Sequence, residues 1–197
     1  MKSFSAWKPQ SADVVLEGSR VRLRPAIEED WAAWVAVREA NRAHLKALEP
    51  RWPEDALTES FFRRRLGALR RDWREGLTCA FLIRHKEQGR LIGGFNLNHI
   101  CRGAAQQATL GYWLDRAWEG QGLMTEAATL AADFAFGPLM LHRLHAATLP
   151  HNERSRNLLK RLGFAEEGFA QKYVQIDGVW ADHVLFGLTA EDWQGRK

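Results

Sequence analysis

Apolar side chains in the first third of the chain recur at helical spacing. The clearest series, with spacings of four, three and four residues, consists of Phe62, Leu66, Leu69 and Trp73. These positions share one helical face, and Thr58 is placed to cap the helix at its N-terminus. An earlier helix is predicted after the acidic run at 28–30, and residues 21–24 alternate like a strand ahead of it.

The apolar pattern becomes strand-like from residue 77 onward. Residues 77–84 and 91–100 flank a polar turn that contains Gly89, which predicts a hairpin. A third strand is predicted at 108–115, after a loop at 101–107. A helix then extends to about residue 136.

In the last third of the chain, the apolar pattern alternates between strand-like and helical spacing. A strand at 143–149 and a helix at 152–162 are followed by strands at 172–176 and 180–188, which flank the turn signal Asp177-Gly178. The predicted order is β, α, α, β, β, β, α, β, α, β, β. It indicates one α/β domain with a mixed central sheet and helices on both faces. We place this domain at 14–193, between an N-terminal extension at 1–13 and a tail at 194–197.

Composition agrees with a single soluble domain. The chain has 197 residues, of which 46% are hydrophobic and 26% charged, an ordinary balance for a globular protein. The formal net charge of +4 is compatible with a solvated basic surface, an anionic ligand or a ribonucleoprotein partner. It does not by itself indicate DNA binding.

Several classes of protein are disfavoured by what the chain lacks. The two cysteines, Cys79 and Cys101, make neither a disulfide framework nor a metal set. Residues 1–13 lack the apolar run of a signal peptide, and no segment has the length of a membrane span. We therefore expect a cytoplasmic protein with no metal ion and no membrane contact.

Gly120 and Gly122 lie where a predicted strand gives way to a helix. A glycine loop that opens a helix binds anions, because unpaired backbone N–H groups and the positive end of the helix dipole face the ligand. The loop lacks the third glycine of a dinucleotide fingerprint and the Gly-Lys-Ser/Thr of a Walker loop. It predicts a phosphate cradle of another kind.

Asn152 and Ser155 are one helical turn apart in the helix that follows Pro150. One interpretation is that Asn152 simply caps this helix. The other is that both side chains contact a long phosphorylated ligand whose phosphates lie on the glycine loop.

These two segments, in this order, resemble the Gcn5-related N-acetyltransferase (GNAT) superfamily, and more narrowly its RimJ/RimL-type ribosomal-protein-alanine N-acetyltransferases, with the RimJ branch the more similar. The resemblance covers residues 20–193 and is densest at 110–127. Further matching segments are Asn41, His44-Leu45-Lys46, Glu49-Pro50, His142-Arg143, Pro150-His151-Asn152, Leu162-Gly163-Phe164, Ile176-Asp177-Gly178, Trp180 and Asp182-His183-Val184.

The resemblance implies a site for acetyl-CoA. It implies that the backbone of Tyr112, Trp113 and Leu114 pairs with pantetheine, that Asn152 also contacts pantetheine, and that Ser155 protonates the leaving thiolate. It implies that the pyrophosphate is held by the loop residues Glu119, Gly120, Gln121, Gly122, Leu123, Met124 and Thr125. The implied acceptor is the N-terminal alanine of a ribosomal protein, the fifth protein of the small subunit, with a possible contact to the ribosome.

Three positions depart from the superfamily pattern. Glu119 stands where the family has glutamine or arginine, and Arg154 or Lys160 would have to supply the missing positive charge. Thr109 stands where many members carry a glutamate base, and Leu159 where others carry a tyrosine acid. Other ionisable candidates, which we expect to be structural, are Glu126, Tyr173, Asp182 and His183.

The missing base bears on the acceptor. An α-amine has a pKa near 8, against about 10.4 for lysine, so an enzyme without a strong base suits an N-terminal amine. Acetylation of a small amine, such as a polyamine, an antibiotic or an amino acid, is an alternative. A non-catalytic module that senses acyl-CoA or binds the ribosome is another.

Two groups of side chains are candidates for the acceptor surface. The aromatic residues that would line a groove are Trp52, Phe95, Tyr173 and Trp180. The arginines that flank the apolar stripe of the second helix are Arg63, Arg64, Arg65, Arg70, Arg71 and Arg74. Such a basic series is either a solvated helix face or a docking surface for RNA or an acidic protein.

Overall fold

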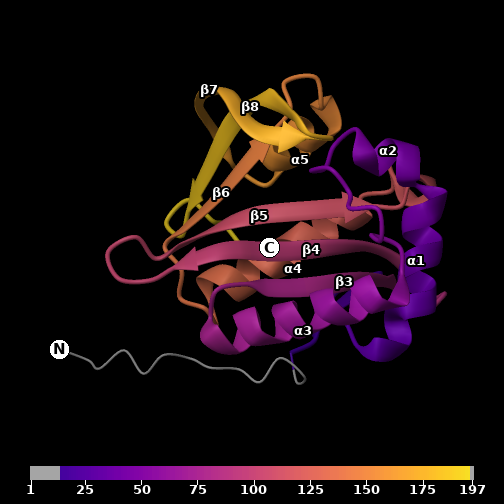
Figure 1. The fold of residues 1–197 in the computed structure, drawn as a ribbon. Helices are drawn as coiled ribbons and strands as arrows, with labels where there is room; N and C mark the ends of the chain where they lie inside the picture. The colour runs from indigo at the N-terminus through magenta and orange to yellow at the C-terminus, as the bar shows by residue number, and fades with distance from the viewer. Residues whose placement is uncertain (1–13, 196–197) are drawn as a thin grey trace.

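A computed structural model describes residues 14–195, and the expected extension at 1–13 lies outside the described residues. Within them, eight strands form one sheet in the order β1-β2-β3-β4-β5-β6-β8-β7 (Figure 1). The strands are β1 (Leu16–Glu17), β2 (Val21–Arg24), β3 (Cys79–His85), β4 (Leu91–Cys101), β5 (Gln107–Leu114), β6 (Arg143–Thr148), β7 (Ala165–Ile176) and β8 (Val179–Thr189). The helices are α1 (Trp31–Ala40), α2 (Arg42–Lys46), α3 (Glu59–Glu75), α4 (Leu123–Phe136) and α5 (Glu153–Arg161), with 3₁₀ turns η2 (Glu28–Asp30) and η3 (Arg116–Trp118).

Helices cover both faces of the sheet, as expected, and each face has its own core. Side chains of β3 alternate between the two: Leu82 packs with Trp34 of α1 and Phe62 of α3, whereas Phe81 packs against Phe134 of α4. Figure 1 shows α3 in front of the sheet and α4 behind it. The predicted mixed α/β domain is confirmed.

The sheet opens between β5 and β6, its parallel pair. These strands are in register only at Gln107↔Arg143, Ala108↔Leu144 and Thr109↔His145. Beyond Thr109, β5 continues to Leu114 along β4, while β6 continues along β8, and the two strands diverge (Figure 1). The backbone of β5 from 110 to 114 therefore has no strand partner on its β6 side.

Local signals in the sequence place most element ends correctly. Thr58 accepts a hydrogen bond from the Phe61 N–H at 3.2 Å, which confirms the predicted cap of α3. Asp177 and Gly178, with φ of 45° and 87°, form the tight turn predicted between β7 and β8. Both left-handed residues suit a turn whose twist matches that of the two strands.

Three features differ from the sequence prediction. β7 begins at residue 165, whereas the sequence predicted a start at 172. The prediction missed the first half of the strand because most side chains there are exposed and show no apolar alternation. β1 has two residues and α2 has five. Both are too short to give a periodic signal in the sequence.

No helix among residues 14–195 is both long and apolar enough to span a bilayer.

Candidate active site

A cavity of about 1470 Å³ occupies the opening between β5 and β6. Its walls include Trp34 and Phe62 from the α1/α3 side of the sheet and Thr129 and Ser155 from the α4/α5 side. The cavity therefore passes through the sheet, and ligands on opposite faces can meet inside it.

The glycine loop forms one end of this cavity. Gly122 is the N-cap of α4 with φ of 75°, and Gly120 has φ of 76°, a conformation that L side chains rarely adopt. The first hydrogen bond of the helix runs from the Glu126 N–H to the Gly122 carbonyl at 3.1 Å. The amides that precede Glu126 in α4 have no intrahelical acceptor, and together with the helix dipole they would attract an anion.

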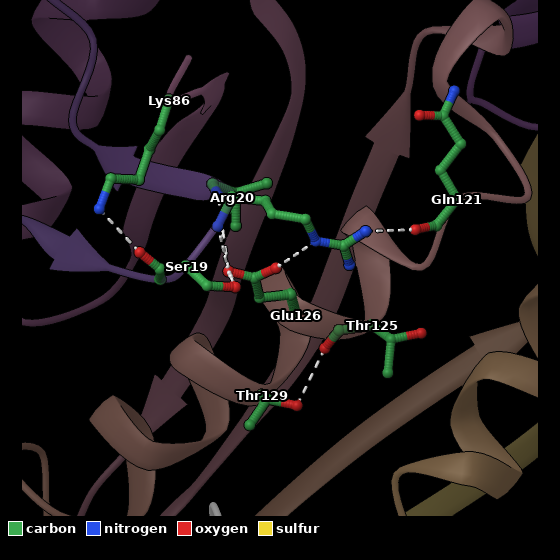
Figure 2. A network of polar contacts seen from close by, with 9 residues as sticks. Ser19, Arg20, Lys86, Gln121, Thr125, Glu126 and Thr129 are labelled. Atoms are coloured by element: carbon green, nitrogen blue, oxygen red, sulfur yellow. Dashed lines mark hydrogen bonds and ion pairs between the residues drawn. The ribbon is translucent and has the colours of Figure 1, made fainter.

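Arg20, which directly precedes β2 and is distant from the loop in sequence, hydrogen-bonds to it. Its Nη1 donates to the Gln121 carbonyl at 2.8 Å, and its Nε donates to Glu126 at 3.2 Å (Figure 2). Burial alone would raise the pKa of Glu126, but hydrogen bonds from Arg20, Ser19 and Val21 outweigh burial and lower it. Glu126 is thus an ionised anchor for the loop, which confirms its expected structural role.

Glu119 points toward Arg154 and His44 instead of into an anion site. Its carboxylate pairs with Arg154 of α5 and with His44 Nε2 at 3.1 Å. Burial lowers the pKa of His44, and the charges of Arg116 and Arg154 lower it further. Arg154 thereby neutralises the unusual acid, whereas Lys160 does not line the cavity.

Asn152, Ser155 and Tyr112 meet beside the opening. Asn152 Oδ1 accepts from the Ser155 N–H at 3.1 Å, so the predicted helix cap is confirmed. Tyr112 Oη lies 2.7 Å from Ser155 Oγ. Burial raises the pKa of Tyr112 to about 12 and outweighs the effect of the Ser155 hydrogen bond. The phenol therefore stays protonated at neutral pH and can donate to Ser155.

An arginine surrounded by tryptophans forms the wall on the α1 side. The Arg38 guanidinium lies 5.3 Å from the Trp34 ring, 4.3 Å from Trp52 and 5.2 Å from Trp113. It donates to both carboxylate oxygens of Glu49, at 3.1 and 2.5 Å, and Trp52 Nε1 donates to Glu49 at 2.7 Å. Sequence analysis did not single out Arg38, and it noted Glu49 only in a matching segment, because neither stands in a local motif.

The predicted acceptor aromatics separate into two groups. Trp52 lines the cavity. Phe95 does not, because it is fully buried and stacks on Tyr112 at 5.6 Å, so that expectation is wrong. Tyr173 and Trp180 are exposed on the β7–β8 hairpin and also lie outside the cavity.

The other ionisable candidates have structural partners. Asp182 accepts from the Lys172 N–H at 2.8 Å. His183 is buried at the cavity wall, with Nδ1 3.0 Å from the Ala181 carbonyl. Among residues 14–195, no group of three or more His, Cys, Asp and Glu side chains is arranged to hold a metal ion.

The predicted binding residues converge on the cavity with one exception. Those that line it are Tyr112, Trp113, Leu114, Glu119, Gly120, Gly122, Leu123, Met124, Thr125, Asn152 and Ser155. The exception is Gln121, whose side chain donates to the Ala117 carbonyl at 3.3 Å.

Comparison with known proteins agrees with this geometry. The profile of the acetyltransferase (GNAT) domain matches residues 20–165. The [ribosomal protein uS5]-alanine N-acetyltransferase of Escherichia coli (strain K12) is 39% identical over 153 residues, which are 78% of this chain and 79% of that protein.

Two solved structures are similar along most of their length. Mycobacterium smegmatis RimJ in complex with CoA-disulfide has a TM-score of 0.82 and 34% identity, covering 87% of this chain and 82% of that one. The ribosomal-protein-S5-alanine acetyltransferase from Vibrio fischeri has a TM-score of 0.85 and 32% identity, covering 92% and 100%. The glycine loop, the cavity through the sheet and these matches agree, and the chain belongs to the GNAT acetyltransferase family.

Proposed function

We propose that the protein is an acetyl-CoA-dependent N-acetyltransferase that acts on the N-terminal alanine of a ribosomal protein. The cavity that passes through the sheet carries this proposal, because it lets an acyl donor on the α4/α5 side meet an acceptor on the α1/α3 side. The names of the E. coli and Vibrio fischeri relatives make uS5 the first acceptor to test. Such an enzyme would act in the cytoplasm, where ribosomal proteins are made.

The residues present fit acetyl-CoA. The amides of Leu123, Met124 and Thr125 would hold the pyrophosphate, and Arg20 would fix the shape of the loop through its hydrogen bond to the Gln121 carbonyl. The unpaired backbone edge of β5 would hydrogen-bond the amides of pantetheine. The RimJ relative that is in complex with CoA-disulfide supports this ligand class.

The chemistry would be direct transfer within a ternary complex. Acetyl-CoA supplies the acetyl group as a thioester. The backbone N–H groups of β5 near Trp113 would polarise the thioester carbonyl. As the neutral amine nitrogen bonds to that carbon, it would lose a proton to water, and as the C–S bond breaks Ser155 would donate a proton to the departing sulfur. Tyr112 would orient the Ser155 hydroxyl and pass it a proton, which Tyr112 would regain from water. Holding both reactants in one cavity would supply much of the acceleration.

The carboxylates around the cavity favour an acceptor that loses its proton easily. Among the described residues, each acid that lines the cavity pairs with an arginine: Glu49 with Arg38, Glu119 with Arg154 and Glu126 with Arg20. None is therefore an unpaired base, and an α-amine, whose proton leaves to water, is the better substrate.

Intact-mass analysis would test this function. The protein is incubated with acetyl-CoA and separated ribosomal proteins, and we expect one acetyl group on the N-terminus of a single chain. Acetylation of lysines alone, or of a small amine but no protein, would reject the assignment. Tight acetyl-CoA binding with no transfer to any amine would favour the non-catalytic alternative.

Gly122→Val tests the loop as the anion site. We expect acetyl-CoA to bind at least about tenfold more weakly, or 1.4 kcal/mol, because a β-branched side chain at φ of 75° distorts the loop and lies against Arg20 Nη2. Calorimetry measures the affinity.

Gly76→Val is the matched control for backbone strain. Gly76 has φ of 72° at the end of α3 and does not line the cavity. Both variants should lose thermal stability, whereas only Gly122→Val should lose affinity. Equal affinity in the two folded variants would remove the loop from the site.

A further inference from the structure

Arg65 differs from the arginines around it on α3. Arg63 pairs with Glu59 at 2.8 Å and Arg64 pairs with Asp55. Arg65 has no hydrogen bond or ion pair with any residue from 14 to 195. Its charge therefore remains available to a ligand.

Arg65 lies in the wall of the cavity. It shares this wall with Phe61, Phe62 and Leu66 of the same helix, at the solvent-exposed edge of the buried stripe that Phe62 and Leu66 form. The Arg65 side chain is exposed to solvent, but protein atoms also lie around it, as expected at the mouth of an open cavity. These surroundings and the charge of Arg38 lower the pKa of Arg65, whereas Glu49 raises it. An anionic group of a ligand, in addition to the Glu49 carboxylate, would therefore be favoured beside Arg65.

A second arginine that lines the cavity, Arg51, also has no ion pair with an acid in the part of the chain that the structure describes. Arg51 donates to the Asp177 carbonyl at 3.3 Å, and its guanidinium lies over Gly178 in the β7–β8 turn. The Asp177 N–H donates to the Glu49 carbonyl at 3.0 Å. The segment 49–51 is thus held against the turn, with Arg51 in the wall of the cavity.

Among residues 14–195, none of the acids that line the cavity forms an ion pair with Arg65 or Arg51. Glu49 is engaged by Arg38 and Trp52. The other lining acids, Glu119 and Glu126, lie at the glycine-loop end. The acceptor end of the cavity is therefore positive, and because α3 lies on the opposite face from α4, these arginines are separate from the loop that would hold phosphate.

We propose that Arg65, supported by Arg51, binds an acidic side chain that follows the acceptor's N-terminal amine by a few residues. The inference rests on the proposed function, since it assumes that a peptide N-terminus enters at the α1/α3 side. It adds a sequence preference: the substrate carries Asp or Glu shortly after its first residue.

Paired peptides test this preference. Each has a free N-terminal alanine and either glutamate or glutamine at position two, three or four. We expect kcat/KM to be about three- to tenfold higher for glutamate at the best position, as for a partly solvated charge pair. Arg65→Gln should abolish the difference between the glutamate and glutamine peptides.

Arg63→Gln is the matched control. It removes the same charge from the same helix, but Arg63 does not line the cavity, so the glutamate preference should persist. Arg65→Glu should instead prefer a peptide with arginine at that position. Equal loss in the Arg63 and Arg65 variants, or no preference in the unmodified protein, would overturn the inference.

Further outcomes distinguish this inference from its alternatives. A fall in acetyl-CoA affinity in Arg65→Gln would assign the residue to the donor and overturn the inference. Arg65-dependent competition by a short RNA, without any effect of the peptide charge, would also overturn it. Acetylation of glutamate and glutamine peptides at equal rates would overturn the inference alone, whereas acetylation of neither would overturn the proposed function with it.

Discussion

Ser155→Ala should lower kcat and kcat/KM for acetyl transfer together by roughly ten- to a thousandfold, while acetyl-CoA affinity stays nearly unchanged. The reason is that a hydroxyl which gives its proton to the departing sulfur acts mainly in the transition state. The Tyr112 phenol at 2.7 Å fixes the direction of that hydroxyl. Steady-state kinetics and calorimetry on one preparation measure both quantities.

Two further variants separate the catalytic role from a structural one. Ser155→Thr keeps the hydroxyl and should retain more activity than Ser155→Ala. Tyr112→Phe removes only the partner hydroxyl and should give a smaller loss in kcat. The helix cap from Asn152 to the Ser155 amide survives all three changes, so melting temperatures should stay close to the starting value. An unaltered kcat in a stable Ser155→Ala protein would reject the catalytic role.

A peptide with a free N-terminal alanine should be acetylated at least about a hundredfold faster than the same peptide with a blocked N-terminus and an internal lysine. Deprotonating lysine at neutral pH costs about 3 kcal/mol more than deprotonating an α-amine, which corresponds to about two orders of magnitude in rate. Each acid that lines the cavity is paired with an arginine, so the described residues offer no unpaired carboxylate to offset this cost. Mass spectrometry of the two peptides measures the rates.

A peptide with both a free N-terminus and the internal lysine serves as the control. Its acetyl group should appear on the α-amine, as fragmentation would show. Equal rates on the two single-amine peptides would contradict the α-amine assignment and favour a lysine acetyltransferase.

The sequence predicted elements wherever a local signal was present. The stripe of α3 with its Thr58 cap, the glycine loop before α4, and the turn at Asp177 and Gly178 each depend on residues close together in the chain. The first half of β7 had no such signal, because its strand character comes from pairing with β8 and most of its side chains are exposed.

The residues of the candidate site also divide into those with a local sequence signal and those without one. The glycine loop and the Asn152-x-x-Ser155 helix are short motifs, and both line the cavity. The contacts that complete the site join distant segments: Arg20 reaches Glu126, Tyr112 reaches Ser155, and Arg154 reaches Glu119. The hydrophobic periodicity of the sequence does not predict such contacts, because the partners lie far apart in the chain and neither segment alone shows that they will meet.

The sequence by itself determined the family resemblance, the α/β class, the glycine loop before α4 and the helix that carries Ser155, because short-range geometry specifies each of them. Only the tertiary structure decided that β5 and β6 separate after Thr109, that the cavity crosses the sheet, and that Glu119 turns to Arg154. It also decided that Arg65 lines the cavity with no ion pair to any residue from 14 to 195, while Arg63 pairs with Glu59. The physical reason is that strand divergence and charge pairing depend on segments brought together by burial in two separate cores.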